Sequence, residues 1–229
     1  QAQSHKENLQ LLHSMNEVEN SAVLLNNQQH IVPLNNLDQK KIVSLHFGFS
    51  YQNTFDSILN KYNFVDTLNA GVYADSANYF FLEDGLKYFN TVIIALDNSL
   101  VQNKKILQFI NDINTRKNVI VAYFGNGENL SALNKINAPV LWNHYTNDVA
   151  AFVTPQIIFG GIAAKGVLPK NFSLEYKKGQ GFTTTATRLK FTVPEDVNIN
   201  SNDLLAIDSI AATAIEQKAT PGLVVLAAT

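Results

Sequence analysis

Two apolar runs separated by one amphipathic segment constrain the fold of this chain more than any other feature. The runs cover residues 91–96 and 119–124, and neither alternates between apolar and polar residues as a half-exposed strand would. Both are rich in β-branched residues, which predicts strands buried on both faces. Between them, residues 100–113 carry apolar side chains at helical spacing. The sequence therefore predicts a right-handed βαβ unit with two parallel, neighbouring strands.

The rest of the chain repeats this alternation of strands and helices. Further strands are expected at residues 21–25, 41–47, 64–68 and 138–142, and further helices at 54–62, 77–88 and 150–164. Residues 31–34 are expected to return beside the strand at 21–25, and Ser4 with Glu7 forms a possible capping box for a first helix. The predicted fold is α/β, a three-layer α/β/α sandwich with a mostly parallel sheet of five or six strands.

Composition excludes several classes of function. The 229 residues are 46% hydrophobic and 16% charged, which is an ordinary globular balance. The formal net charge of −2 offers no basic face to a phosphate backbone, so we expect no nucleic-acid partner. The absence of cysteine excludes thiolate metal sites and a cysteine nucleophile. No apolar run approaches 18 residues, so no membrane-spanning segment is predicted.

Periodicity is lost after residue 165 and returns near the end of the chain. Residues 190–203 are predicted to be a linker, followed by a helix at 204–218 and a strand at 223–226. The sequence starts without methionine and ends inside an apolar run. We therefore expect a piece of a longer protein, with one domain at 1–189 and the truncated start of a second domain at 204–229.

Two sequence marks resemble the second domain of family 3 glycoside hydrolases. The first runs from residues 21–27 to Val32-Pro33-Leu34; in the family, a strand ending in Leu-Leu-Lys-Asn is followed by Leu-Pro-Leu. Here Asn26 stands where the family often has lysine. The second mark, Gly160-Gly161 followed by Gly-Val-Leu-Pro at 166–169, is similar to the family's Pro-x-Gly-Lys-Leu-Pro exit, although the proline before the glycine is missing.

One further pattern before residue 190 resembles the same domain, and the residues after 190 resemble a different family. Tyr176, Gly179 and Gly181 are similar to a Tyr-x-x-Gly-x-Gly pattern of the same domain. Residues 207–226 resemble instead the first helix and strand of serine β-lactamases and penicillin-binding-type hydrolases. The nucleophile motif of those enzymes, Ser-x-x-Lys, lies well beyond that opening and does not occur in this chain.

The resemblance, over roughly residues 8–185, implies an accessory domain of a bacterial family 3 glycosidase. In that family the aspartate nucleophile lies in a barrel domain, which this sequence lacks, so the chain would have no catalytic residue and would be inactive alone. The implied parent is a retaining β-N-acetylglucosaminidase acting on cell-wall-type glycans. Its barrel would be the partner of this domain, and a cell-wall substrate would imply a periplasmic, cell-surface or secreted location. No cofactor or metal is implied.

Candidate binding residues follow two adjacent predicted strands. In an open parallel sheet, ligand-facing groups lie at the carboxyl ends of the strands. Asp97 and Asn126 occupy such positions and are predicted to bind substrate, by hydrogen bonds to sugar hydroxyls, or to face a partner domain. Capping of the next helix or fixing of a turn explains both residues as well.

Other titratable residues favour structural explanations. Glycoside hydrolysis needs two carboxyl groups that flank the scissile bond, and the candidates are Asp75, Glu83 and Asp84. Acidic residues also favour solvated helix starts, which is the simpler explanation here. His46 and His144 lack a third metal ligand nearby in the sequence and are interpreted as structural histidines.

Two functions of other classes remain open. One is a docking domain between two catalytic units that touches no substrate, and sugar binding would distinguish it from a glycosidase domain. The other is a small-molecule-binding domain of flavodoxin-like architecture. The segment Gly125-Asn126-Gly127 lacks both the G-x-G-x-x-G fingerprint and the lysine of a phosphate loop, which counts against that function and predicts a tight turn.

Overall fold

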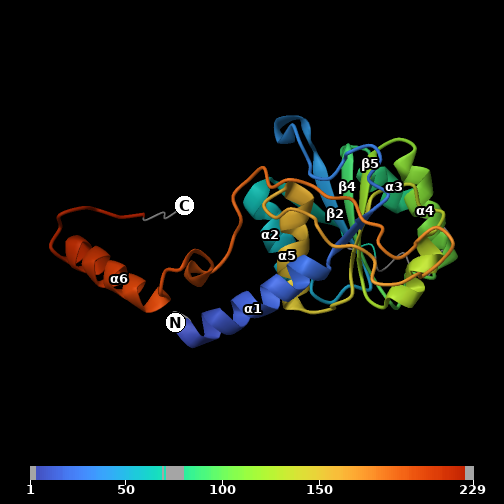
Figure 1. Cartoon of the computed structure of the whole chain (residues 1–229). Coiled ribbons are helices and arrows are strands. Elements are labelled where there is room, and N and C mark those ends of the chain that lie inside the picture. Colours follow the sequence, from blue (N-terminus) through green and yellow to red (C-terminus); the bar gives the residue numbers. More distant parts are fainter. Residues whose placement is uncertain (1–3, 69, 71–79, 225–229) are drawn as a thin grey trace. The chain divides into compact units, whose positions relative to one another are not determined.

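The computed structural model describes residues 4–68, 70 and 80–224 (Figure 1). It divides into two units, one formed by residues 17–190 and the other by residues 1–16 with 191–229. Helix α1 (His5–Ser21) begins with the expected capping box, because the amide of Ser4 donates to Glu7 Oε2 at 2.8 Å and the amide of Glu7 donates to Ser4 Oγ at 3.4 Å.

One six-stranded sheet organises the larger unit. Its strands are β1 (Val23–Leu25), β2 (Ile42–Phe47), β3 (Val65–Leu68), β4 (Thr91–Asp97), β5 (Asn118–Phe124) and β6 (Val140–Asn143). The spatial order is β1-β6-β5-β4-β2-β3, and every pair is parallel except β1 with β6. This arrangement confirms the predicted α/β class and the mostly parallel sheet.

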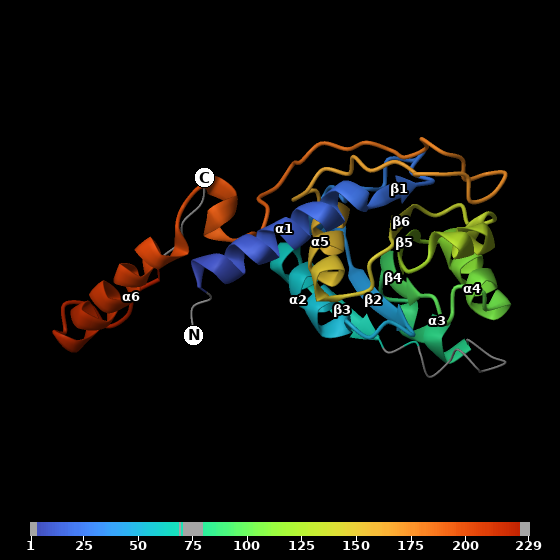
Figure 2. The same ribbon diagram turned by 60° about the horizontal axis from the view of Figure 1, so that its bottom comes forward.

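Helices cover both faces of the sheet and complete the three layers (Figure 2). Helices α2 (Gln52–Tyr62) and α5 (Asp148–Phe159) pack together on one face, and α3 (Phe80–Leu86) and α4 (Lys104–Asn114) lie on the other. None of the helices in the described part of the chain combines the length and apolar composition needed to cross a membrane.

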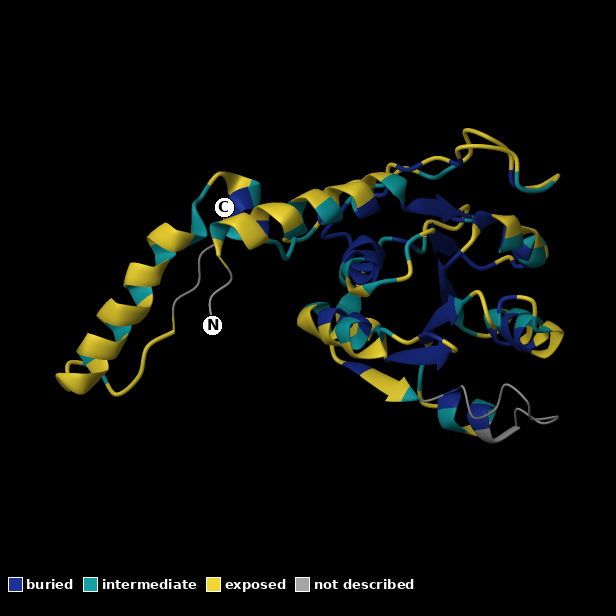
Figure 3. Cartoon of the chain, turned by 90° about the horizontal axis from the view of Figure 1, so that it is seen from below, coloured by how far each residue is buried: buried dark blue, intermediate teal, exposed yellow. Residues whose placement is uncertain are grey.

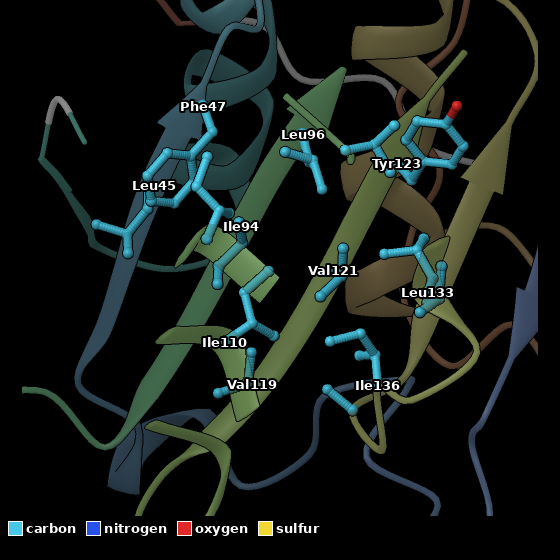
Figure 4. Packing of buried hydrophobic residues seen from close by; sticks show 14 of the residues in the cluster. Leu45, Phe47, Ile94, Leu96, Ile110, Val119, Val121, Tyr123, Leu133 and Ile136 are labelled. Atoms are coloured by element: carbon cyan, nitrogen blue, oxygen red, sulfur yellow. The ribbon is translucent and has the colours of Figure 1, made fainter. Parts of the chain in front are cut away.

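The central βαβ unit forms as the sequence predicts. The side chain of Asn103 caps α4 by accepting hydrogen bonds from the amides of Lys105 and Ile106, at 3.0 and 3.4 Å. Ile110 on α4 is fully buried against β4 and β5, whose facing residues include Ile94 and Val121 (Figure 4). Burial of this apolar layer provides the main stabilisation of the unit.

Residues 31–34 do not form the expected second strand beside β1. The side-chain amide of Asn27 donates to the carbonyl of Val32 at 2.7 Å and accepts from its amide at 3.0 Å. The amide of Leu34 donates to the carbonyl of Ile158 on α5 at 2.9 Å. Because these partners satisfy the backbone of the segment, it packs against α5 and does not join the sheet.

Helix boundaries differ from the expected ones at several places. Helix α5 ends at Phe159, before the predicted end at 164, because Gly160 takes the left-handed conformation with φ of 78°. Residues 100–103 form a turn before α4, and the expected helix at 77–88 is the shorter α3, with 77–79 outside the described residues. Leu223 and Val224 are not in a strand, and 225–226 lie outside the described residues.

The smaller unit contains a 3₁₀ helix, η4 (Pro194–Val197), and helix α6 (Ser201–Glu216). The buried Glu195 accepts hydrogen bonds from His5 Nδ1 at 2.9 Å and from the amide of Ser201 at 3.1 Å. No residue of α6 is buried, and most of its surface is drawn as exposed in Figure 3. The β-lactamase-like identity expected for residues 204–229 stays a prediction.

Candidate functional site

The two predicted binding residues lie at the carboxyl ends of β4 and β5, which are neighbours in the sheet. Asp97 Oδ1 accepts from the amide of Ser99 at 2.9 Å and from its hydroxyl, which fixes the turn after β4. Asn126 Oδ1 accepts from the amide of Glu128 at 3.1 Å and so caps the 3₁₀ helix η3 (Gly127–Leu133). Both residues therefore have the structural roles that the sequence allowed as alternatives, and their binding of substrate stays a prediction.

Each of these side chains uses only one of its two polar atoms in the hydrogen bonds of its turn. Among the residues that the structure describes, none makes a hydrogen bond to Asp97 Oδ2 or Asn126 Nδ2. A carboxylate oxygen accepts and an amide nitrogen donates, so together the two can bind the hydroxyl groups of a sugar or the polar atoms of another domain.

Asn98 joins the two turns, and sequence reasoning did not select it. Its Oδ1 accepts from the hydroxyl of Tyr123 at 2.6 Å, from the amide of Asn126 at 2.9 Å and from Asn129 Nδ2 at 3.1 Å. Burial raises the pKa of Tyr123 to about 12, although the hydrogen bond with Asn129 lowers it and the charge of Asp97 raises it further. A buried tyrosine near the end of a strand needs a polar partner, and this was the available signal.

Glycine allows the turns at this edge to approach one another closely. A Cβ atom on Gly48 would lie 2.5 Å from Ser99 Oγ and 2.6 Å from Asp97 Oδ1, and one on Gly125 would lie 2.2 Å from Asn98 Oδ1. Both glycines have positive φ, at 73° and 150°. The edge is therefore a tightly packed surface whose polar groups are held in place before any partner binds.

The buried His46 pairs with the partly buried Asp56 behind the same edge. His46, which is 3% exposed, places Nε2 2.9 Å from Asp56 Oδ2 and 3.2 Å from Ser44 Oγ. Thr67 also donates to Asp56 Oδ2, at 3.1 Å. Within the described residues, no group of three potential metal ligands includes His46, His144 or any other side chain.

Two of the three candidate catalytic carboxylates lie among the described residues, and both form ion pairs. Glu83 lies 3.2 Å from Arg116 and Asp84 lies 3.0 Å from Lys87, both as exposed ion pairs on the surface of the protein. Asp75 lies outside the described residues. The described carboxylates are therefore in the solvated setting that the sequence favoured.

The fold and this edge define the class to which the chain belongs, an α/β domain with a six-stranded, mostly parallel sheet. No protein-family model and no curated protein matches the sequence. Among solved structures, the fold is similar to part of a fungal multi-domain GH3 β-N-acetylglucosaminidase with a GCN5-related glucosamine N-acetyltransferase region, with a TM-score of 0.54 and 13% identity over 79% of this chain.

A second solved structure with the same fold is a family 3 β-N-acetylglucosaminidase from Paenibacillus sp. str. FPU-7. Its TM-score is 0.55, at 15% identity over 70% of this chain. This chain spans about a fifth of the fungal chain and about a third of the Paenibacillus chain. At these identities the similarity establishes a shared fold.

Proposed function

We propose that this chain is the accessory, non-nucleophile domain of a family 3 glycosidase of the β-N-acetylglucosaminidase type. The observation that carries the proposal is the fold shared with two such enzymes over 79% and 70% of the chain. It agrees with the resemblance of the sequence marks at residues 21–34 and 159–169 to the second domain of that family.

The residues that carry those two marks lie against each other in the structure. Arg188 Nη1 donates to the carbonyl of Leu34 at 2.8 Å, and a Cβ atom on Gly160 would lie 2.9 Å from Pro33 Cβ. A Cβ atom on Gly166 would lie 2.2 Å from the carbonyl of Ala22, beside β1. The residues of the second mark thus pack against β1 and the segment that follows it. This packing supports a shared architecture, and it gives these residues a structural role and no catalytic one.

In this proposal the chemistry belongs to a barrel domain elsewhere in a longer protein. The free atoms of Asp97 and Asn126 would bind the hydroxyl groups of the glycan. The longer protein would be a bacterial retaining enzyme acting on cell-wall-type glycans in the periplasm, at the cell surface or outside the cell. Residues 204–229 would open a serine hydrolase domain of the β-lactamase type.

Hydrolysis of a chromogenic β-N-acetylglucosaminide tests the proposal. We expect turnover by the longer protein and none by this chain under the same conditions. Within the longer protein, Asp97→Asn and Asn126→Asp keep the acceptors that fix the turns but change the two free atoms, so KM for an oligosaccharide should rise without loss of thermal stability. Asp112→Asn, an exposed change on α4, is the matched control. Turnover by this chain alone would overturn the proposal.

A docking domain between two catalytic units is the second candidate. It is favoured by the hydrogen bonds that Asp97 and Asn126 make within their own turns. Under this function the same two variants would leave KM unchanged and would instead weaken the binding of a separately produced barrel domain to this chain. The two measurements together separate the candidates.

A further inference from the structure

A pocket of about 940 Å³ lies at the amino-terminal end of the parallel strands, whereas Asp97 and Asn126 lie at their carboxyl-terminal end. Its lining residues are 25, 26, 28 and 29 at the end of β1, the last residue of α4, residues 134, 136 and 137 before β6, and residues 175, 176 and 179–182. All of them belong to the unit of residues 17–190. The volume falls within the range of about 300–1,000 Å³ that is typical of small-molecule sites.

Side-chain amides dominate the wall of this pocket, with seven among its fourteen lining residues. Four of them, Gln28, Gln29, Asn114 and Asn137, make no side-chain hydrogen bond to any residue in the described part of the chain. Each amide group carries both a donor and an acceptor. The pocket therefore offers several hydrogen-bonding groups of both kinds that have no partner among the residues that the structure describes.

The remaining contacts hold the pocket in shape. Asn26 Nδ2 donates to the carbonyl of Ile136 at 2.8 Å and to the hydroxyl of Tyr176 at 2.9 Å, which ties three segments together. The amide of Phe182 donates to the carbonyl of Leu24 on β1 at 2.7 Å. A Cβ atom on Gly181 would lie 2.3 Å from the carbonyl of Gly166, so this wall is closely packed from behind. A preformed site loses less entropy when a ligand binds.

The lining residues also decide which ligand chemistry fits. Leu25, Ile136 and Tyr176 are buried and form an apolar base, and the ring of Phe182 is half-buried. The only charged lining residue is Glu175, so an anion would find no cation to pair with and a metal ion would find a single carboxylate. An entirely apolar ligand would displace water from the side-chain amides without replacing the hydrogen bonds that the water makes with them. A neutral ligand with many hydroxyl groups and an apolar face satisfies both parts of the wall.

We propose that this pocket is a binding site for a neutral saccharide, separate from the edge that carries Asp97 and Asn126. Sugar hydroxyls both donate and accept, as the free amides do, and the carbon-bearing face of a pyranose ring covers the apolar base. The site does not depend on the proposed glycosidase function, because its lining residues are independent of that edge.

Titration of the ¹⁵N-labelled chain with chitotetraose and cellotetraose, followed by NMR, tests the site. We expect saturable shifts in the side-chain amide signals of Asn114, Asn137, Gln28 and Gln29 with at least one tetrasaccharide. Inorganic phosphate and tetragalacturonate serve as the anionic probes, and we expect no saturable shifts of these signals with either. Binding of an anion in place of a neutral sugar would contradict the proposal.

Variants assign the binding to this pocket. Gln29→Ala combined with Asn114→Ala and Asn137→Ala should weaken saccharide binding at least tenfold, which corresponds to about 1.4 kcal/mol. The matched control changes three exposed amides on helices, Asn16, Asn53 and Gln108, to alanine and should leave the affinity unchanged. If the triple variant fails to fold, Asn114→Ala alone is used, because alanine is favourable at the end of α4.

Three results would overturn the proposal. They are the absence of saturable shifts with both tetrasaccharides, shifts confined to the signals of Asn98, Asn126 and Asn129, and equal affinity in the triple and control variants. Because the assay follows binding by this chain, its outcome does not depend on whether the longer protein hydrolyses a glycoside.

Discussion

Asn98 shows how one side chain can hold two loops in register. Its Oδ1 accepts from Tyr123 on β5, from Asn126 in the following turn and from Asn129 on η3. Asn98→Ala leaves three donors without this acceptor, so we expect a loss of about 1–3 kcal/mol in the free energy of unfolding. Urea denaturation measures this loss. Asn129→Ala, which removes one of the three hydrogen bonds, is the control and should cost less; an equal cost would contradict a central role for Asn98.

Two tyrosines with raised pKa values predict a dependence of stability on alkaline pH. Burial raises the pKa of Tyr62 to about 12, although Arg188 lowers it, and burial likewise raises the pKa of Tyr123 to about 12. A pKa raised above the ordinary value of about 10 means that the phenols contribute full stability below pH 10 and lose it as the pH rises from 10 through 12.

Absorbance of phenolate between pH 9 and pH 13 checks this expectation. In the folded chain, part of the phenolate absorbance of the eight tyrosines should appear at a higher pH than the rest, which we call the late part. In guanidinium, all of the absorbance should appear over the same pH range. Tyr123→Phe should reduce the late part by one tyrosine. An unchanged late part in this variant would show that Tyr123 titrates with the exposed phenols.

Among elements, the six strands of the sheet were predictable, whereas the strands expected at 31–34 and at 223–224 did not form. The runs at 91–96 and 119–124 form β4 and β5 as expected, because a continuous apolar run rich in β-branched residues predicts a strand buried on both faces. Residues 31–34 look like a strand in sequence, but Val32 exchanges two hydrogen bonds with the side chain of Asn27, and the amide of Leu34 donates to the carbonyl of Ile158 on α5. The first contact is a side-chain bond within one turn and the second joins residues distant in the chain. Periodicity carries no information about either.

The two candidate sites also differ in whether the sequence could predict them. Asp97 and Asn126 could be selected because each directly follows a recognisable strand. The amide pocket could not be foreseen, since its wall combines four stretches of the chain whose meeting depends on the position of β1 at the edge of the sheet. No single stretch of the sequence carries a motif for it.

Asn27 gives a prediction for the segment at 31–34. Asn27 is 2% exposed, and its amide satisfies both backbone groups of Val32. Asn27→Ala should lower the free energy of unfolding by about 2–3 kcal/mol, because buried backbone groups lose their partners. Asn27→Asp keeps an acceptor and loses the donor, so it should fall between the wild type and Asn27→Ala in urea denaturation. A cost below that of Asn35→Ala, an exposed asparagine nearby, would contradict this role.

The tie between His5, Glu195 and Ser201 predicts a transition in acid. Burial raises the pKa of Glu195, but hydrogen bonds from His5 and Ser201 outweigh it and lower the pKa to about 2. A lowered pKa means that the tie contributes its full stability above the unfolded value of about 4.5 and loses it as the pH falls through about 2.

Hydrogen exchange of the Ser201 amide measures the tie. Its protection should fall between pH 4.5 and pH 2, after correction for the intrinsic rate. Glu195→Gln should remove this pH dependence, and Glu216→Gln on the same unit is the control. Protection that is unchanged down to pH 2 would argue against the hydrogen bond from Ser201 to the carboxylate.

For the whole molecule, stability is expected to reside in the unit of residues 17–190. The apolar cluster around β4 and β5 lies entirely within it, whereas no residue of α6 is buried. Removal of residues 204–229, which leaves the hydrogen bond from Ser201 to Glu195 in place, should therefore change Tm by less than about 2 °C, since about 1 kcal/mol moves Tm by about 2–4 °C in chains of this size. Ile110→Ala, which removes buried carbon atoms from the core, should instead cost about 2–5 kcal/mol. Differential scanning calorimetry compares the two, and a drop after truncation as large as that of Ile110→Ala would contradict the assignment.

The apolar side chains of α6 carry the last prediction. Leu205, Ile210 and Ile215 are 48%, 67% and 46% exposed, which is high for large aliphatic residues on one helix. If residues 204–229 open a further domain of a longer protein, as proposed, these side chains become buried there. Hydrogen exchange of α6 should then be fast in this chain and strongly protected in the longer protein, while α4 exchanges slowly in both. Equal exchange of α6 in the two proteins would sink the proposal that it belongs to a second domain, because a helix packed in a core opens far less often than an exposed one.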